Sequence, residues 1–291
     1  MTAVNHPPVV VGYDSSEHGQ AALDAAAMQA VRRRLPLHIV HALGVRPYAE
    51  LFPAGEMPVD TVPWRAAGQA LLDQVAADLR ERYPGLETST CVRMSSPTVL
   101  LLEQSRGAEI LVVGARGGGG FVGLTVGAVG AQVTTHALCP VLVVRPAARP
   151  GGPVVVGVDG SAGSEAAVGF AFEQAAAREV GLVALHAYLP WAYETPRTED
   201  LPSDLVHKDD ARRVLSESVA GWAEKFPDVD VELRVEREQP TAALVQASGE
   251  AQLLVVGSRG RGGFRGLLIG SVSRTALHHA ACTVAVVRDG H

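Results

Sequence analysis

The chain has 291 residues, a length that fits two domains of ordinary size, and 47% of them are hydrophobic. A net charge of −6 argues against a nucleic-acid-binding protein, and three cysteines with no Cys-x-x-Cys pair argue against a disulfide framework and a zinc site. The first residues lack the basic and apolar regions of a secretory signal, and the uncharged stretch 117–144 contains seven glycines, so we expect a cytoplasmic protein without a membrane segment.

The predicted elements of the first half alternate between strands and helices. We expect strands at 8–13, 37–42, 87–92, 110–114 and 141–144, and helices at about 17–34, 64–83, 98–105 and 129–138. A turn-rich loop fills 46–63. The second half repeats this order, with its variable loop at 189–202 and its long helix at 205–226. Such alternation predicts an α/β fold built from parallel β-α-β units.

The two halves are copies of one domain. VVVGYDSS at 9–16 matches VVVGVDGS at 154–161, and AEILVVGARG at 108–117 matches AQLLVVGSRG at 251–260. Two further matched blocks occur in the same order, so we predict domain 1 at 1–146 and domain 2 at 153–291. The proline- and glycine-rich linker is 147–152.

A glycine-rich loop follows the fourth strand of each copy. In domain 2 it reads Gly257-x-x-Gly260, nine residues, then Gly270-Ser271 at a helix start. Glycine lets backbone N–H groups approach an oxyanion, and a helix N-terminus favours negative charge, so the pattern suits phosphates. The first strand ends at Asp159, and that carboxylate faces the loop if the two strands are neighbours. No Gly-Lys pair occurs in the chain, which excludes a Walker loop.

With the strand-end aspartate and the Val-Val-Gly before it, this loop resembles the ATP-binding class of the universal stress protein family. The resemblance implies two tandem Rossmann-like (adenine nucleotide alpha hydrolase-like) domains, each with a five-stranded parallel sheet of order 3-2-1-4-5. It implies ATP as the bound nucleotide, with accompanying Mg²⁺ left open, and domains that pair through the last strands, 141–144 and 283–287, within the chain or in a homodimer. The implied ATP-binding residues of domain 2 are Asp159, Ala187, Gly257, Gly260, Arg261, Gly263, Gly270, Ser271, Val272 and Ser273.

Domain 1 departs from the pattern at the helix start, where Ala128 and Gly130 replace the two serines. A lost hydrogen bond to a charged group costs roughly 1.5–3 kcal/mol, so we expect weaker ATP binding in domain 1, or none. The corresponding residues of domain 1 are Asp14, Ala42, Gly114, Gly117, Gly120, Gly127 and Ala128.

The leading hypothesis is an ATP-binding regulatory module of the stress response with at most slow hydrolysis. The loop offers glycine, serine and arginine, whereas phosphoryl transfer recruits positioned cations, metal-binding carboxylates and a residue that orients water. We predict no catalytic residue and no metal ligand. The alternatives are a dimerisation scaffold without nucleotide and a slow ATPase or adenylyl-transfer enzyme, although the latter requires an SGGxDS-type loop that the first strands lack. His41 and His186 are interpreted as structural, and Cys139 and Cys282 as buried, inert thiols.

Overall fold

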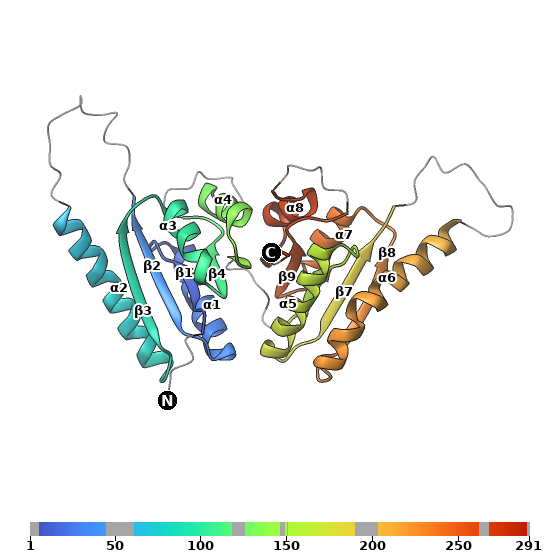
Figure 1. The fold of residues 1–291 in the computed structure, drawn as a ribbon, viewed down its shortest axis with the longest axis horizontal. Helices are drawn as coiled ribbons and strands as arrows, with labels where there is room; N and C mark the ends of the chain where they lie inside the picture. Colours follow the sequence, from blue (N-terminus) through green and yellow to red (C-terminus); the bar gives the residue numbers. More distant parts are fainter. Residues whose placement is uncertain are drawn as a thin grey trace, which may run out of the picture. The chain divides into compact units, whose positions relative to one another are not determined.

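The structure is a computed structural model. It describes residues 6–44, 61–117, 126–145, 149, 151–189, 203–261 and 268–289, without the side chains of 203–207. Gly120, Gly263 and most of the two variable loops lie outside these ranges. The chain divides into two compact units, Met1–Val144 and Arg145–His291, so the division falls just before the predicted linker. Figure 1 shows strands and covering helices in each unit.

Domain 1 contains the predicted alternation of strands and helices. Its elements are β1 (Val9–Gly12), α1 (Glu17–Arg33), β2 (Leu37–Leu43), α2 (Val62–Arg82), β3 (Thr88–Met94), α3 (Pro97–Gln104), a 3₁₀ turn (Ser105–Gly107), β4 (Ile110–Gly114), α4 (Ala128–His136) and β5 (Val141–Val144). In its described part the strands are all parallel, in the order β3-β2-β1-β4-β5.

Domain 2 repeats this architecture. Its elements are β6 (Val154–Gly157), α5 (Ala162–Arg178), β7 (Leu182–Ala187), α6 (Ser203–Lys225), β8 (Val231–Glu236), α7 (Pro240–Ala247), β9 (Leu253–Gly257), α8 (Ser271–His279) and β10 (Thr283–Val287). Its strands are parallel in the order β8-β7-β6-β9-β10. The predicted α/β class and the strand order 3-2-1-4-5 are therefore confirmed in both copies.

Helices cover both faces of each sheet. In domain 1 the Gly12 position faces Leu101 of α3, whereas the Gly114 position faces His18 of α1, which places α1 and α3 on opposite faces. The central strands are consequently buried on both sides, and Val9, Val11 and Val112 are fully buried. Burial on both faces explains why these strands read as continuous apolar runs in the sequence.

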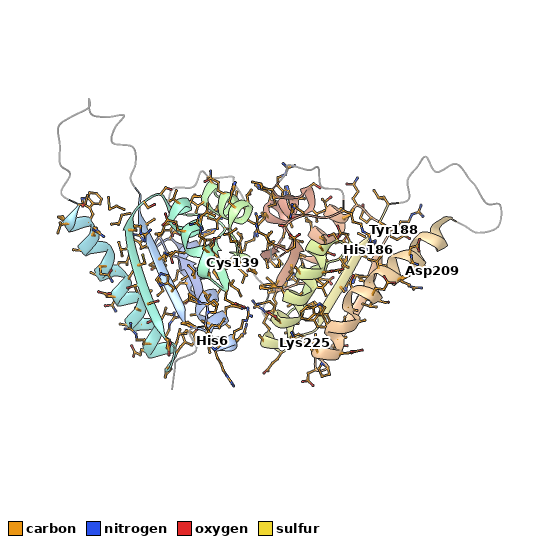
Figure 2. All side chains as sticks on the ribbon, viewed as in Figure 1. His6, Cys139, His186, Tyr188, Asp209 and Lys225 are labelled. Carbon is orange, nitrogen blue, oxygen red and sulfur yellow. The ribbon has the colours of Figure 1, made fainter. Side chains whose placement is uncertain are left out.

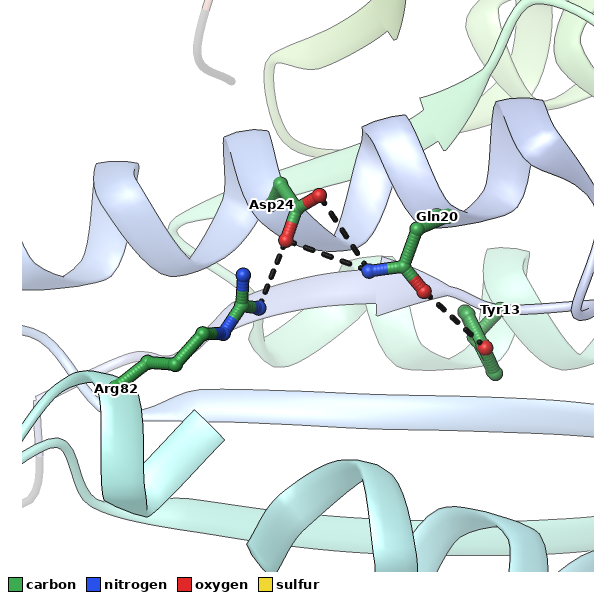
Figure 3. Close-up of polar contacts among 4 residues, drawn as sticks. All are labelled: Tyr13, Gln20, Asp24 and Arg82. Carbon is green, nitrogen blue, oxygen red and sulfur yellow. Dashed lines mark hydrogen bonds and ion pairs between the residues drawn. The ribbon is translucent and has the colours of Figure 1, made fainter. Parts of the chain in front are cut away.

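Polar contacts join the long helix of domain 1 to α1. Arg82 at the end of α2 donates to Asp24 of α1 at 2.8 Å, Gln20 donates to the same carboxylate at 3.3 Å, and the Tyr13 hydroxyl donates to Gln20 at 3.4 Å (Figure 3). The ion pair is nearly half exposed on both sides, so it contributes little to stability.

Domain 2 replaces that network with aromatic packing. Gly169 stands where domain 1 has Asp24, and a Cβ atom there would overlap the indole ring of Trp222 in α6. The Lys225 ammonium, whose position is marked in Figure 2, lies 4.8 Å from the centre of the Trp222 ring. The two copies thus share a fold, but the contacts between the first helix and the long helix differ.

The residue that follows each strand-end aspartate has a left-handed backbone conformation. In domain 2 this residue is Gly160, at φ +72°, and in domain 1 it is Ser15, at φ +62°. A left-handed conformation costs a residue with a Cβ atom about 1–2 kcal/mol, only part of which glycine's greater unfolded-state entropy offsets. Ser15→Gly is therefore expected to stabilise domain 1 by about 0.5–1 kcal/mol in urea unfolding.

The matched control for this change is Gly160→Ser. It introduces the same strain into domain 2, and its Cβ would also lie 2.6 Å from the Arg261 guanidinium. We expect a loss of stability there. A lower unfolding free energy for Ser15→Gly would contradict the explanation by backbone strain.

Candidate functional site

Each domain places its aspartate and its glycine loop at the same edge of the sheet. β1 pairs with β4 through Val11 and Val112, and β6 pairs with β9 through Val156 and Val255. The carboxyl ends of these strand pairs therefore lie together, and the segments that follow them meet. Ligands of doubly wound sheets bind at this kind of location, where the strand order reverses.

Domain 1 has a cavity of about 440 Å³ at this edge. Such a volume is within the ordinary range for small-molecule sites. Its walls are mostly apolar and include Leu100 and Leu101 of α3. All the predicted site residues of domain 1 that the structure describes line it: Asp14, Ala42, Gly114, Gly117, Gly127 and Ala128.

The helix that follows the glycine loop begins in the same way in both domains. Gly127 and Gly270 are the N-caps of α4 and α8, with φ/ψ of −73°/162° and −75°/164°. The N–H of each N-cap glycine donates at 2.7 Å to a loop carbonyl, that of Ala115 or that of Ser258. The N–H groups of the first helical turn have no intrahelical partner, and together with the helix dipole they favour an anion. In α8 that turn is Ser271, Val272 and Ser273.

Asp159 fastens the glycine loop of domain 2 to the end of β6. One carboxylate oxygen accepts the N–H of Arg261 at 2.9 Å, and the other accepts the N–H of Ser161 at 2.9 Å. Burial raises the pKa of this carboxyl, but hydrogen bonds from Ser161, Arg261 and Ser164 outweigh burial and bring the pKa below its ordinary value of 3.8. Asp159 is therefore charged at neutral pH and holds the loop in place.

The Ser273 hydroxyl has a different role from the one predicted, whereas its backbone N–H remains in the first turn of α8. Its side chain is 2% exposed, and its hydroxyl donates to the carbonyl oxygen of Gly257 at 2.6 Å. The single hydroxyl proton is thus used to join α8 to the end of β9, and it is not available to a phosphate in this arrangement. Ser271, in contrast, is exposed in the first turn of α8.

Gly114 and Gly257 have a packing role in addition to the site role that the motif predicts. A Cβ atom at Gly257 would lie 2.6 Å from the carbonyl oxygen of Gly163 in α5, and one at Gly114 would lie 2.6 Å from that of His18 in α1. These glycines allow a helix backbone to approach the strand. Gly117 and Gly260, whose added Cβ atoms would meet the carboxylates of Asp14 and Asp159, allow the loop to approach the aspartate.

The Arg261 side chain extends from the loop toward Gly160, which follows the end of β6. Its guanidinium lies against Gly160, whose position is also bordered by Val214 of α6. Arg261 thus contributes two separate groups to the site, its backbone N–H to Asp159 and an exposed cation near the end of β6. The sequence predicted that the Arg261 side chain adds positive charge to the loop. It did not predict the hydrogen bond from the Arg261 backbone N–H to Asp159.

The strand-end histidines are structural. His41 Nδ1 lies 2.7 Å from the carbonyl oxygen of Tyr13, and His186 Nδ1 lies 2.7 Å from that of Val158 (Figure 2 marks His186). A carbonyl only accepts, so each ring donates its Nδ1–H and joins β2 to β1, or β7 to β6. Ala187 ends β7 just after its histidine and pairs with β8.

The two equivalent cysteines are inert. Burial raises the pKa of the Cys139 thiol to about 12 and that of Cys282 to about 11, so neither forms a thiolate at neutral pH. Within the described ranges, His, Cys, Asp and Glu side chains form no group of three that could hold a metal ion. No helix in the described part of the chain is long and apolar enough to span a membrane.

The fold and the site define a protein with two Rossmann-like α/β domains, each with a glycine loop and a helix N-terminus at the carboxyl edge of its sheet. The sequence profile of the universal stress protein family matches residues 6–145 and 152–288, and the chain belongs to this family as a tandem-domain member.

Proteins of the same family resemble the chain over nearly its whole length. The universal stress protein Rv2623 of Mycobacterium tuberculosis is 37% identical over 97% of this chain and 96% of its own. A universal stress protein of Mycolicibacterium smegmatis is 37% identical over 96% of each chain. The solved structure of one from Archaeoglobus fulgidus has a TM-score of 0.71 at 18% identity, covering 97% of this chain and 98% of its own, which shows the shared fold.

Proposed function

We propose that the protein is an ATP-binding regulatory module in which the carboxyl-edge site of each domain receives the nucleotide. The observation that supports this most strongly is the cavity of domain 1, which is lined by all six described residues predicted for that site. Its apolar walls suit an adenine ring, while the start of α4 suits phosphates. Domain 2 offers the same helix start with one exposed hydroxyl, at Ser271.

The two domains should differ in affinity rather than in kind. The cavity of domain 1 is open although Ala128 has replaced the serine of the helix start, so this replacement removes a donor without closing the site. One hydrogen bond to a charged oxygen is worth roughly 1.5–3 kcal/mol, which corresponds to about ten- to a hundred-fold in affinity. Domain 2 is therefore the tighter site in this proposal.

Hydrolysis should be slow at most. Of the described residues that line the cavity of domain 1, Asp14 and Arg116 carry charge, and Arg116 Nε donates to His18 at 3.0 Å. Fast phosphoryl transfer uses several positioned cations and metal-binding carboxylates together. Nucleotide occupancy would instead act by favouring one conformation or partner complex, which requires different affinities for the two states.

Titration of the nucleotide-free chain with ATP is expected to show two classes of site, the weaker by about tenfold or more. Ser271→Ala should weaken the tight class, and the reciprocal Ala128→Ser should strengthen the weak one, because the exchange moves one hydroxyl between equivalent helix starts. Isothermal titration calorimetry gives both affinities, and acid extraction of the purified protein identifies any nucleotide already bound.

Two equally tight sites would contradict the assignment of the difference to Ser271. No detectable ATP binding, together with no adenine nucleotide in the extract, would overturn the proposal and favour a scaffold that works without nucleotide. Release of inorganic phosphate at ordinary enzymatic rates, roughly 1 per second or faster, would identify an enzyme instead.

A further inference from the structure

Ser258 has a buried hydroxyl at the carboxyl edge of the domain 2 sheet. It follows β9 directly and is 1% exposed. Among the described residues, its Oγ has no hydrogen-bond partner. A buried polar group that gives up water without gaining a partner is uncommon in folded proteins and points to a partner from outside the chain.

The Ser258 side chain lies on the face of the sheet opposite α5. Side chains alternate along a strand, and the neighbouring Gly257 position faces Gly163 of α5, so Ser258 faces the opposite side. Its carbonyl oxygen accepts the N–H of Gly270, the N-cap of α8, at 2.7 Å. The hydroxyl therefore lies beside the start of the helix that is suited to bind phosphate.

Domain 1 shows what this position borders. Ala115, the counterpart of Ser258, accepts the N–H of Gly127 at the same 2.7 Å and lines the 440 Å³ cavity. The backbone thus takes the same course in both copies, and only the side chain changes. At the position where domain 1 has the Ala115 side chain at its cavity, domain 2 thus has a buried hydroxyl.

We propose that Ser258 is a ligand-contacting residue of domain 2, whose hydroxyl donates to a phosphate oxygen of a nucleotide held at the start of α8. This inference rests on the proposed function. It adds a second hydroxyl, besides Ser271, to the donors that domain 2 has and domain 1 lacks.

The test is Ser258→Ala, which gives domain 2 the side chain that domain 1 already accommodates. The ATP affinity of the tight class is expected to fall about tenfold. The unfolding midpoint without nucleotide should stay the same or rise, because removing this buried hydroxyl breaks no hydrogen bond among the described residues. The reciprocal Ala115→Ser should strengthen binding in domain 1.

Ser248→Ala is the matched control. The Ser248 hydroxyl is also buried but donates to Val245 at 2.6 Å and accepts the N–H of Ala281 at 2.9 Å. Its loss should lower the midpoint and leave ATP affinity unchanged. If Ser258→Ala behaves like this control, while the wild-type chain binds ATP, the Ser258 assignment alone is overturned. If the wild-type chain does not bind ATP, the proposed function fails and this inference fails with it.

Discussion

Gly257→Ala is expected to destabilise domain 2 by about 2–3 kcal/mol and to abolish its nucleotide binding. The new Cβ would lie 2.6 Å from the carbonyl oxygen of Gly163 and 2.7 Å from the carbonyl carbon. Both are backbone atoms, so no side chain can rotate away and the first turn of α5 must move. That turn follows directly from Asp159, which holds the glycine loop. A shift of α5 therefore disturbs packing and site together.

Urea unfolding followed by circular dichroism measures the stability change, and titration calorimetry measures the loss of the tight class of ATP site. Gly221→Ala is the matched control, since it makes the same chemical change in α6 of the same domain, where the new Cβ would meet nothing within 4 Å outside its own stretch of helix. It should stabilise the helix by up to about 1 kcal/mol. Wild-type stability and binding in Gly257→Ala would show that the close approach of α5 is not required.

The fold was predictable because its signals are local and repeated. Strands such as β1 and β4 are apolar throughout because both faces are covered, and helices such as α1 begin at a serine, Ser16, that accepts the N–H of Gly19 at 3.0 Å. Two copies in one chain doubled the evidence for each element. The exact helix ends shifted by one or two residues, which reflects capping geometry that residue patterns describe only approximately.

Individual roles within the loop were less predictable, because they depend on which atom another segment brings near. Ser273 fits a phosphate donor by position, yet its hydroxyl is bound by the Gly257 carbonyl across the end of the strand. No sequence motif pointed to Ser258, which stands out only because its hydroxyl is buried without a hydrogen-bond partner in the described part of the chain. Ala128 predicted that domain 1 lacks a hydroxyl donor for phosphate. It did not predict the open cavity of domain 1, which depends on how the residues of the cavity walls pack.

Asp159→Ala is expected to weaken ATP binding in domain 2 by more than a hundredfold and to destabilise the domain by about 2 kcal/mol. The carboxylate accepts the N–H of Arg261 in the glycine loop and that of Ser161 at the start of α5. Without it both N–H groups lose a charged acceptor, and the loop is no longer fixed to β6. The partial exposure of Asp159 keeps the stability loss moderate. Asp209→Ala, at an exposed position of α6 marked in Figure 2, should change neither quantity measurably.

The pH dependence separates the charge of Asp159 from its volume. Because its pKa in the folded state lies below the ordinary 3.8, the stability it contributes is present above that value and is lost as pH falls through the folded-state pKa. The difference in unfolding free energy between the wild type and Asp159→Ala should therefore be constant from about pH 7 to pH 5 and shrink below pH 3.8. A difference that persists unchanged at lower pH would mean that packing, rather than the carboxylate, joins the loop to the strand.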